Sequence, residues 1–458
     1  MSRVCTLAED RRDAVESFVA DWLTDETVPS AGVALVDGDD VVYADGFGAR
    51  DLESNAPASA ETMYGVASVT KSFVATSVLQ LESDGHLDLD DPVTEHVDYF
   101  SELADPPTVH ELLSHTSGMP SDGASVALIA RLVDGGGAAT APLSSDADVR
   151  RNVRQSAGER ADGDRFFYYN TGYTVLGELV EAVDGRPFPE YVADEVLAPL
   201  GMHRSVVRAD PADYDDAMTP YLADDGDLQR SSFPVKGVGA AGGLLSSAAD
   251  LATYLKFAMH GDEDVLPDSR RERALESHAT RGELLDGTEK RYGYGWMRRS
   301  FLGDELIGHS GSLGVSSAYV GFLEEAELGV AVAANADPDV HPTYVGKALL
   351  ALLRGADPDD VVPFYALRAK CQRVAGRYES YRSAMAAVVE ASGGELDVTL
   401  ETALGEESLT AFPESMDGDD RSFYTVGAGG ERVPLTFETA DGGLDCYYQR
   451  WRLHETDE

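Results

Sequence analysis

Lysine is scarce in this sequence. It occurs six times among 458 residues, and arginine supplies the other 30 of the 36 basic side chains. With 82 acidic residues, the chain carries a net charge of −46 at pH 7. Such a balance argues against direct binding to nucleic acid, because the phosphates would be repelled.

The acidic residues are spread along the whole chain rather than gathered in blocks. Their runs are short, as in the two DGDD stretches at 37–40 and 417–420. An acidic face built for a basic partner would concentrate the charge. At a salt concentration of about 1 M the Debye length falls to about 3 Å, which screens self-repulsion that would be costly in dilute buffer. The composition therefore indicates adaptation to high salt, as in a halophile.

Cysteine and long apolar runs are also lacking. The three cysteines, Cys5, Cys371 and Cys446, have no paired spacing, which argues against a disulfide framework and against a CxxC metal site. No stretch approaches the roughly 18 consecutive apolar residues of a membrane span, and the N-terminus lacks the apolar segment of a signal peptide. We expect a cytoplasmic protein with no membrane partner, no metal and no cofactor.

Hydrophobic periodicity predicts strands near both ends of residues 1–355 and helices between them. One sheet built from both ends, with a helical insertion, would satisfy this pattern and gives an α/β class. The expected elements are a helix at 10–25, a hairpin at 31–52, a helix from near Ser68 to before Gly85, a helix after Ser247 that ends at Gly261, strands after 290 including RYGYGWMRR at 291–299, and a helix at 343–355.

The C-terminal part has a different pattern. Residues 356–364 are expected to form a linker. Short alternating strands with glycine-rich turns follow at 365–458 and predict a small barrel or sandwich. The chain would thus have two domains, 1–355 and 365–458.

Ser68-Val69-Thr70-Lys71 forms an S-x-x-K pattern where a helix is predicted to begin. A serine hydroxyl is a weak nucleophile at neutral pH unless a base takes its proton. Residues i and i+3 share one face of a helix, so Lys71 can reach Ser68. The positive end of the helix dipole and partial burial both oppose protonation of the lysine, which would make it a base. Alone, the pattern also fits a capping serine followed by a surface lysine.

Two further stretches stand out. Tyr-Tyr-Asn at 168–170 contains one of only four asparagines and precedes a predicted helix. His-Ser-Gly-Ser at 309–312 lies at the end of a predicted strand, where glycine allows another backbone to approach closely. Taken singly, each fits an ordinary turn.

In this order and spacing the three motifs resemble those of the serine β-lactamase and penicillin-binding-protein superfamily, whose class A members carry S-x-x-K, S-D-N and K-T-G. Y-x-N and H-S-G in the last two places are similar to the class C β-lactamase-like branch of esterases and D-aminopeptidases. LLSHTSGMP at 112–120 and AGGLLSSAADLATYL at 241–255 also fit. The resemblance covers about residues 10–355 and implies the β-lactamase-like fold. Relatives with a lipocalin-like C-terminal domain, some of them peptidases, would be the nearest analogues.

The resemblance implies three catalytic residues. Ser68 would be the acylated nucleophile, Lys71 would accept or relay its proton, and Tyr168 would be the general acid/base. The backbone N–H groups of Ser68 and Ser312 would form the oxyanion hole.

The resemblance also implies the substrate-binding residues Asn170, His309, Ser310, Gly311 and Ser312. Asn170 would hydrogen-bond both the substrate and the catalytic lysine. His309 stands where β-lactamases carry lysine, and a histidine is a cation only near or below a pKa of about 6.5. We therefore expect a weaker pocket for a lactam carboxylate. We also expect a neutral hydrogen-bonding role for His309 near the catalytic tyrosine, with activity falling as the pH drops through the histidine's pKa.

HELLSH at 110–115 resembles the H-E-x-x-H zinc motif but is one residue too long. Five residues along a helix place the two imidazoles on different faces, so His115 is expected to be structural.

The implied function is a serine hydrolase that forms an acyl-enzyme at Ser68 and acts on esters, amides or small peptides. One alternative is β-lactamase or D-alanyl carboxypeptidase-like activity. Another is a non-catalytic binding or scaffold protein that retains the fold. The C-terminal domain could cover the mouth of the site, bind a ligand, or hold copies of the chain together in a homo-oligomer.

Overall fold

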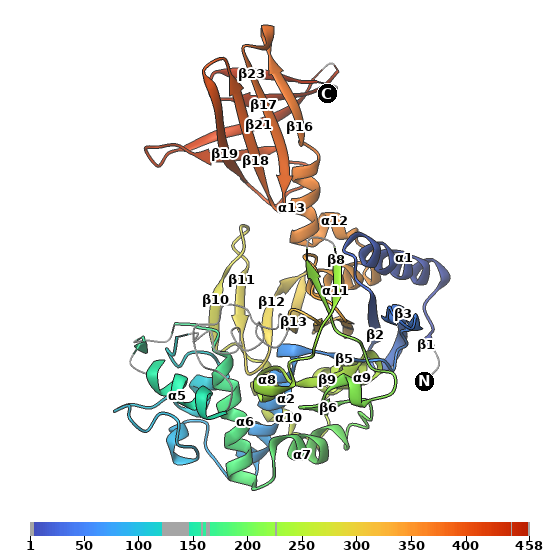
Figure 1. The fold of residues 1–458 in the computed structure, drawn as a ribbon, viewed down its shortest axis with the longest axis vertical. Coiled ribbons are helices and arrows are strands. Elements are labelled where there is room, and N and C mark those ends of the chain that lie inside the picture. The colour runs from blue at the N-terminus through green and yellow to red at the C-terminus, as the bar shows by residue number, and fades with distance from the viewer. Residues whose placement is uncertain are drawn as a thin grey trace. The chain divides into compact units, whose positions relative to one another are not determined.

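The chain divides into two compact units, Met1–Glu283 with Thr288–Gly346, and Leu284–Gly287 with Lys347–Glu458 (Figure 1). The computed structural model describes residues 4–120, 146–156, 159–161, 165–224, 227–440 and 442–456.

The first unit is built on one antiparallel sheet with the strand order β1-β3-β2-β15-β14-β13-β12-β11-β10, and β4 pairs with β3 at its side. Its centre joins the two ends of the unit, because Val33 of β2 lies opposite Val332 of β15. This confirms the sheet predicted from both chain ends. The strands are β1 (Val4–Cys5), β2 (Ser30–Asp37), β3 (Asp40–Asp51), β4 (Ala56–Pro57), β10 (Ala279–Glu283), β11 (Glu289–Tyr292), β12 (Met297–Phe301), β13 (Asp304–Ser312), β14 (Ser317–Leu323) and β15 (Leu328–Ala334).

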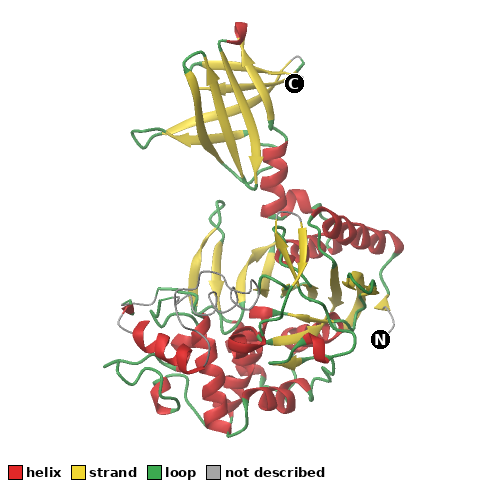
Figure 2. Ribbon diagram, viewed as in Figure 1, coloured by secondary structure: helices red, strands yellow, loops and turns green. Residues whose placement is uncertain are grey.

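Helices cover both faces of this sheet. Successive side chains of a strand point to opposite faces. On β15, Gly329 faces Leu255 of α9, whereas the next residue, Val330, contacts Gly346 of α11. The unit is therefore layered α/β/α, with helices and strands as drawn in Figure 2. Its core lies on both sides of β2, β14 and β15, whose residues are buried except Asp37. The helices are α1 (Glu9–Asp25), α2 (Thr70–Ser83), α3 (Val109–Leu113), α5 (Asp146–Ser156), α6 (Asn170–Asp184), α7 (Phe188–Val192), α8 (Val235–Gly242), α9 (Ala248–His260), α10 (Asp268–Leu275) and α11 (Pro342–Leu353).

Local sequence signals set several of these boundaries. The Ser247 side chain accepts a hydrogen bond from the Asp250 amide at 3.2 Å and so caps α9, and Gly261 ends it with φ +83°. Both ends were predicted. The single strand predicted at 291–299 is wrong. The chain turns between β11 and β12, because Gly295 packs directly against the backbone of α2, where a Cβ would lie 2.7 Å from the Lys71 carbonyl oxygen.

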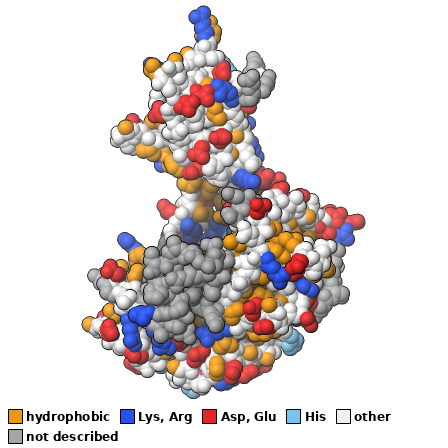
Figure 3. Space-filling view, viewed as in Figure 1, with side chains coloured by type: hydrophobic (Ala, Val, Ile, Leu, Met, Phe, Trp, Pro, Cys, Tyr) orange, Lys and Arg blue, Asp and Glu red, His pale blue; other side chains and the backbone are white. Residues whose placement is uncertain are grey.

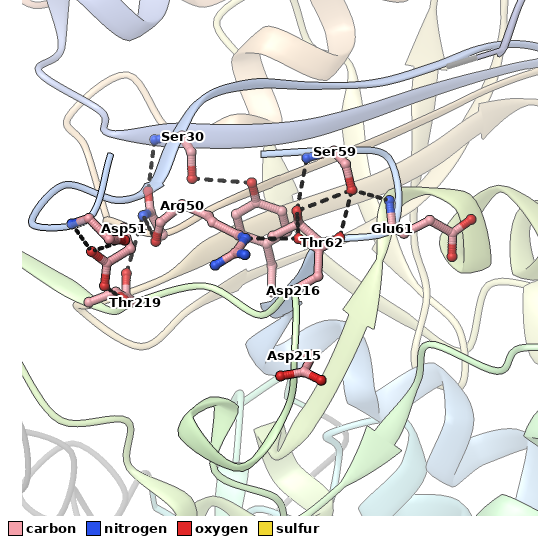
Figure 4. A network of polar contacts seen from close by, with 12 residues as sticks. Ser30, Arg50, Asp51, Ser59, Glu61, Thr62, Asp215, Asp216 and Thr219 are labelled. Atoms are coloured by element: carbon pink, nitrogen blue, oxygen red, sulfur yellow. Dashed lines mark hydrogen bonds and ion pairs between the residues drawn. The ribbon is translucent and has the colours of Figure 1, made fainter. Parts of the chain in front are cut away.

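A polar network holds the short strand β5 (Met63–Gly65), which leads into α2 (Figure 4). Asp216 accepts hydrogen bonds from Ser59 at 2.9 Å and from Thr62 at 2.7 Å, and it pairs with Arg50 Nε at 2.9 Å. Strand β5 belongs to a second small sheet, ordered β5-β9-β6. The remaining short strands are β6 (Val206–Val207), β7 (Tyr221–Asp224), β8 (Asp227–Arg230) and β9 (Leu244–Ser247).

The second unit is a closed eight-stranded antiparallel barrel, which confirms the predicted all-β domain. Apolar side chains pack together inside it, among them Tyr378, Phe423 and Phe437, with ring centroids 5.4–5.9 Å apart. The segment 356–364, expected as a linker, holds α12 (Pro358–Val361) and the start of α13 (Pro363–Gln372). The barrel strands are β16 (Gly376–Ser380), β17 (Met385–Ser392), β18 (Glu395–Thr402), β19 (Gly405–Pro413), β20 (Ser422–Val426), β21 (Arg432–Ala440), β22 (Gly443–Tyr448) and β23 (Trp451–Thr456).

On the face drawn in Figure 3, acidic side chains are scattered among basic and neutral ones. Within the described ranges, no helix has the length and apolar character needed to cross a membrane. In the same ranges no cluster of His, Cys, Asp and Glu side chains has the arrangement of a metal site. Cys371 and Cys446 are buried free thiols, and Cys5 is an exposed one.

Candidate active site

Ser68 lies on a tight turn between β5 and α2. The sequence predicted a helix that begins near Ser68, and the structure places this residue in a 3-10 turn (Ala67–Val69), with α2 starting at Thr70. Ala67 has φ +50°, a left-handed conformation that is unfavourable for a residue with a Cβ. Ser68 is partly exposed, whereas the residues on both sides of it are buried. The turn therefore presents the Ser68 hydroxyl to solvent from an otherwise closed core.

Lys71 is fully buried directly below this hydroxyl. Its Nζ is hydrogen-bonded to Ser68 Oγ at 2.9 Å and donates to the Ala241 carbonyl oxygen at 2.7 Å. Burial lowers the pKa of Lys71 to about 7, because a charged amine is poorly solvated there. At neutral and higher pH a large fraction of this amine is uncharged, and its lone pair can accept a proton from Ser68.

Tyr168 covers the lysine from the other side. Lys71 Nζ lies 5.0 Å from the centroid of the Tyr168 ring. Burial raises the pKa of Tyr168, and a hydrogen bond with Ser68 offsets only part of that rise. The phenol therefore keeps its proton at neutral pH, so near Ser68 it is suited to donate a proton rather than to abstract one.

Strand β13 runs beside the Ser68 turn. A Cβ at Gly311 would lie 2.2 Å from the Val66 carbonyl oxygen and 2.8 Å from the Ser68 amide nitrogen, so only glycine fits at this position. β12 pairs with β13 as far as Gly308, which leaves residues 309–312 beyond that pairing. The end of β13 and the Ser68 amide thus form one edge of the site. The hydroxyl of Ser312, at the end of that strand, donates a hydrogen bond to Asp337.

His309 is fully buried, and its partner differs from the prediction. Its Nδ1 donates to the Ser310 carbonyl oxygen at 2.6 Å, so Nε2 is the acceptor and takes a hydrogen bond from the Tyr292 hydroxyl at 3.1 Å. The Tyr168 ring centroid is 6.3 Å away. Burial, with further contributions from Lys71 and Arg281, lowers the pKa of His309 to about 3. A neutral imidazole agrees with the neutral role expected from the sequence, and the fall of activity on protonation of His309 stays a prediction, which now applies far below pH 6.5.

Asn170 is the first residue of α6, which begins where the sequence predicted a helix. In the described part of the chain, no hydrogen bond joins its side chain to Lys71. The carbonyl oxygen of Ala241, in the last turn of α8, occupies that place on Nζ. The contact of Asn170 with substrate stays a prediction.

Arg281 of β10 was not predicted from the sequence. Its guanidinium lies 5.3 Å from the centroid of the Phe166 ring, and its positive charge lowers the pKa values of Tyr168 and Tyr292. Its Nε is buried without a hydrogen-bond partner, and no carboxylate of the described residues pairs with it. Arg281 therefore places a guanidinium cation near the neutral His309 and near Tyr168.

His115 was expected to be structural, and it lies beside the Tyr168 ring at 4.3 Å between centroids. It follows the short helix α3, is fully buried, and binds the backbone on both sides of Tyr168. In the sequence it stood out only through HELLSH at 110–115 and LLSHTSGMP at 112–120, neither of which indicated contact with Tyr168.

Two family models match the chain, one over its N-terminal part and one over its C-terminal part. The family model described as Beta-lactamase matches residues 12–353, and the model described as Pab87 octamerisation domain matches residues 358–454.

Among solved structures, the chain is similar to the octameric penicillin-binding protein homologue from Pyrococcus abyssi. The two are 35% identical, the alignment covers 96% of this chain and 99% of that one, and the TM-score is 0.88. The D-amino acid amidase from Ochrobactrum anthropi shares the fold, with 23% identity, a TM-score of 0.60, and coverage of 75% and 97%.

Curated relatives match part of the chain. Penicillin-binding protein 4 of Amycolatopsis lactamdurans is 28% identical over 319 residues, which is 65% of this chain and 78% of that protein. Protein flp of Staphylococcus aureus strain MW2 is 25% identical over 352 residues, or 74% of this chain. The match spans 66% of the staphylococcal protein, slightly less than two thirds of its length.

Proposed function

The chain belongs to the β-lactamase and penicillin-binding-protein-like family of serine hydrolases, and from this premise we propose that it forms an acyl-enzyme at Ser68 and hydrolyses esters, amides or small peptides. One observation carries the proposal. The Lys71 amine, with its pKa lowered to about 7, lies 2.9 Å from the hydroxyl oxygen of a partly exposed serine. A scaffold protein would gain nothing from burying an amine beside that hydroxyl, since burial of a charge is costly.

In the proposed mechanism, the proton transfers return the enzyme to its starting protonation state. Neutral Lys71 takes the proton of Ser68 Oγ as this oxygen bonds to the acyl carbon. The backbone N–H groups of Ser68 and Ser312 stabilise the oxyanion that develops. Tyr168 gives its proton to the leaving group as the acyl bond breaks, and Lys71 returns a proton to Tyr168. Water then attacks the acyl carbon and gives a proton to Lys71, which passes it to Ser68 Oγ as the bond between that oxygen and the acyl carbon breaks, so the enzyme regains its starting protonation.

A fluorophosphonate probe tests the acyl-enzyme directly. The wild-type chain should add one phosphonyl group, and peptide mass spectrometry should locate it on Ser68. The matched control is Ser68→Ala, which should stay unlabelled while keeping the wild-type thermal midpoint. A wild-type protein that resists the probe would favour the scaffold alternative and contradict the proposed function.

A second candidate, hydrolysis of substrates that carry a carboxylate, is favoured by Arg281. This class includes the carboxypeptidase-like and β-lactamase alternatives. The lysine that such enzymes carry in the third motif is replaced here by the neutral His309, but the guanidinium of Arg281, whose Nε has no hydrogen-bond partner among the described residues, offers a positive charge near Tyr168. Comparing kcat/KM for one acyl group with a neutral and with a carboxylate-bearing leaving group separates the two candidates.

We further propose that the barrel unit holds the chain in a homo-oligomer. Its support is the octamerisation-domain match together with exposed apolar side chains on the barrel, since Leu404 is fully exposed and Tyr381 is 78% exposed. Leu404→Asp should lower the mass measured by light scattering. Leu52→Asp, which changes a 46% exposed leucine of the first unit, should not. A wild-type monomer at micromolar concentration would contradict the proposal.

A further inference from the structure

A single residue holds the chain on both sides of Tyr168. The Phe167 amide donates to the His115 carbonyl oxygen at 2.9 Å, and the Tyr169 amide donates to His115 Nδ1 at 3.1 Å. The imidazole also packs against the Tyr168 ring, with 4.3 Å between centroids. The backbone before and after Tyr168, and one side of its ring, are therefore fixed by the same residue.

The backbone of His115 has a left-handed conformation, which is unfavourable for a residue with a Cβ and would not be needed for packing alone. Its φ is +60°, and its side chain is fully buried. Nδ1 accepts a hydrogen bond, so the proton of the neutral ring is on Nε2, and this nitrogen has no partner among the described residues. Burial lowers the pKa of His115 well below its ordinary value, so the ring stays neutral. An apolar side chain would avoid the unpaired donor but would lose the bond to Tyr169.

We propose that His115 is the positioning residue for Tyr168. It sets the phenol at the distance and angle from Ser68 that proton donation to the leaving group requires, although it touches neither substrate nor nucleophile. The inference rests on the proposed function, because it assigns His115 to the step in which Tyr168 acts as an acid. His115 accepts hydrogen bonds from the amides of residues 167 and 169. Loss of the side-chain bond to residue 169 would therefore move Tyr168 without displacing Ser68 or Lys71, which lie on another element.

The test compares two substrates with the same acyl group. A p-nitrophenyl ester has a leaving group that departs without a proton, whereas an alkyl amide needs one. General acid catalysis contributes about 10²–10⁴-fold to a rate. His115→Leu removes the acceptor for Tyr169, and kcat should fall at least about tenfold more for the amide than for the ester. His115→Asn keeps an acceptor oxygen and tolerates a positive φ, so it should restore most of the amide rate.

Three controls keep the outcome interpretable. Tyr168→Phe should show the same dependence on the leaving group as His115→Leu. The Tyr168→Phe/His115→Leu double variant should have a kcat on the amide no lower than that of Tyr168→Phe. The fluorophosphonate, whose fluoride needs no proton, should label Ser68 in His115→Leu at near the wild-type rate. If His115→Leu does not fold, His115→Gly takes its place, because glycine also tolerates the left-handed backbone.

Equal losses on ester and amide, or His115→Asn as impaired as His115→Leu, would overturn the positioning role. A wild-type chain that is not labelled at all would instead overturn the proposed function, so the two failures are distinguishable.

Discussion

Lys71→Met is expected to lower kcat by about 10³–10⁴-fold, because the nucleophile loses its base. Ser68→Ala should cost at least as much, since the attacking oxygen is gone. The Ser68→Ala/Lys71→Met double variant should be no slower than Ser68→Ala alone, because the two groups act as one unit. Methionine fills the space of the lysine stem without the amine. Lys256→Met, on α9, is the matched control and should keep wild-type kcat.

Steady-state kinetics on a neutral ester would measure these effects. A Lys71→Met enzyme with more than about a tenth of wild-type kcat would contradict a base role for Lys71. Losses that multiply in the double variant would contradict the single-unit mechanism.

Lys71→Met, which should lower activity, should raise the stability of the folded chain. Lys71 has a pKa of about 7 in the folded chain, against an ordinary value of 10.5. The folded state therefore disfavours the protonated amine. This cost is fully present below pH 7 and is lost as the pH rises toward 10.5. Lys71→Met should thus unfold at a higher temperature than wild type at pH 6, with the difference shrinking at higher pH. The buried amine that the proposed mechanism requires thus lowers the stability of the folded chain below pH 10.5.

The residues proposed as catalytic stand out in the sequence because each belongs to a short pattern. Ser68 and Lys71 are three residues apart and share a helical face, so local geometry alone brings them together. The helix after Tyr168 and the glycine at 311 were likewise local signals. The two-unit fold followed from the change from helical to alternating patterns after residue 355.

The surroundings of these residues could not be predicted in the same way. The carbonyl oxygen of Ala241, which binds Lys71, belongs to the backbone of a residue 170 positions away. Every residue carries such an oxygen, so the sequence gives no sign of this contact. Arg281 of β10 lies near the site only because the whole sheet forms. The break at Gly295, within a stretch read as one strand, arises from packing against α2, which is a tertiary contact.

His309 shows how burial can reverse an expectation drawn from residue type. A histidine titrates near 6.5 in water, and that value led to the prediction that its protonation would limit activity. Inside the folded chain it is enclosed by Tyr292 and the Ser310 carbonyl, and its pKa is lowered to about 3. Among the residues proposed as catalytic, Lys71 is then the group that titrates near neutral pH, with a pKa of about 7.

The pH dependence of kcat/KM should therefore report Lys71. The protonated amine cannot accept the proton of Ser68, so the rate should fall about tenfold for each pH unit below 7 and level off above it. The measurement is a profile from pH 5 to pH 9 on a neutral ester, with thermal unfolding followed at each pH to confirm that the enzyme stays folded.

Two substitutions at His309 test which residue causes the fall in rate at low pH, the acid limb of this profile. His309→Gln keeps a neutral side chain with an acceptor for Tyr292, so its midpoint should stay near that of wild type even where the plateau falls. His309→Lys introduces a like charge near Lys71, which disfavours the protonated amine, so its midpoint should move to lower pH. A limb that disappears in His309→Gln would show that the histidine is the titrating group after all. A limb that stays unmoved in His309→Lys would show that Lys71 is not that group, because a neighbouring cation must shift the pKa of the amine that it faces.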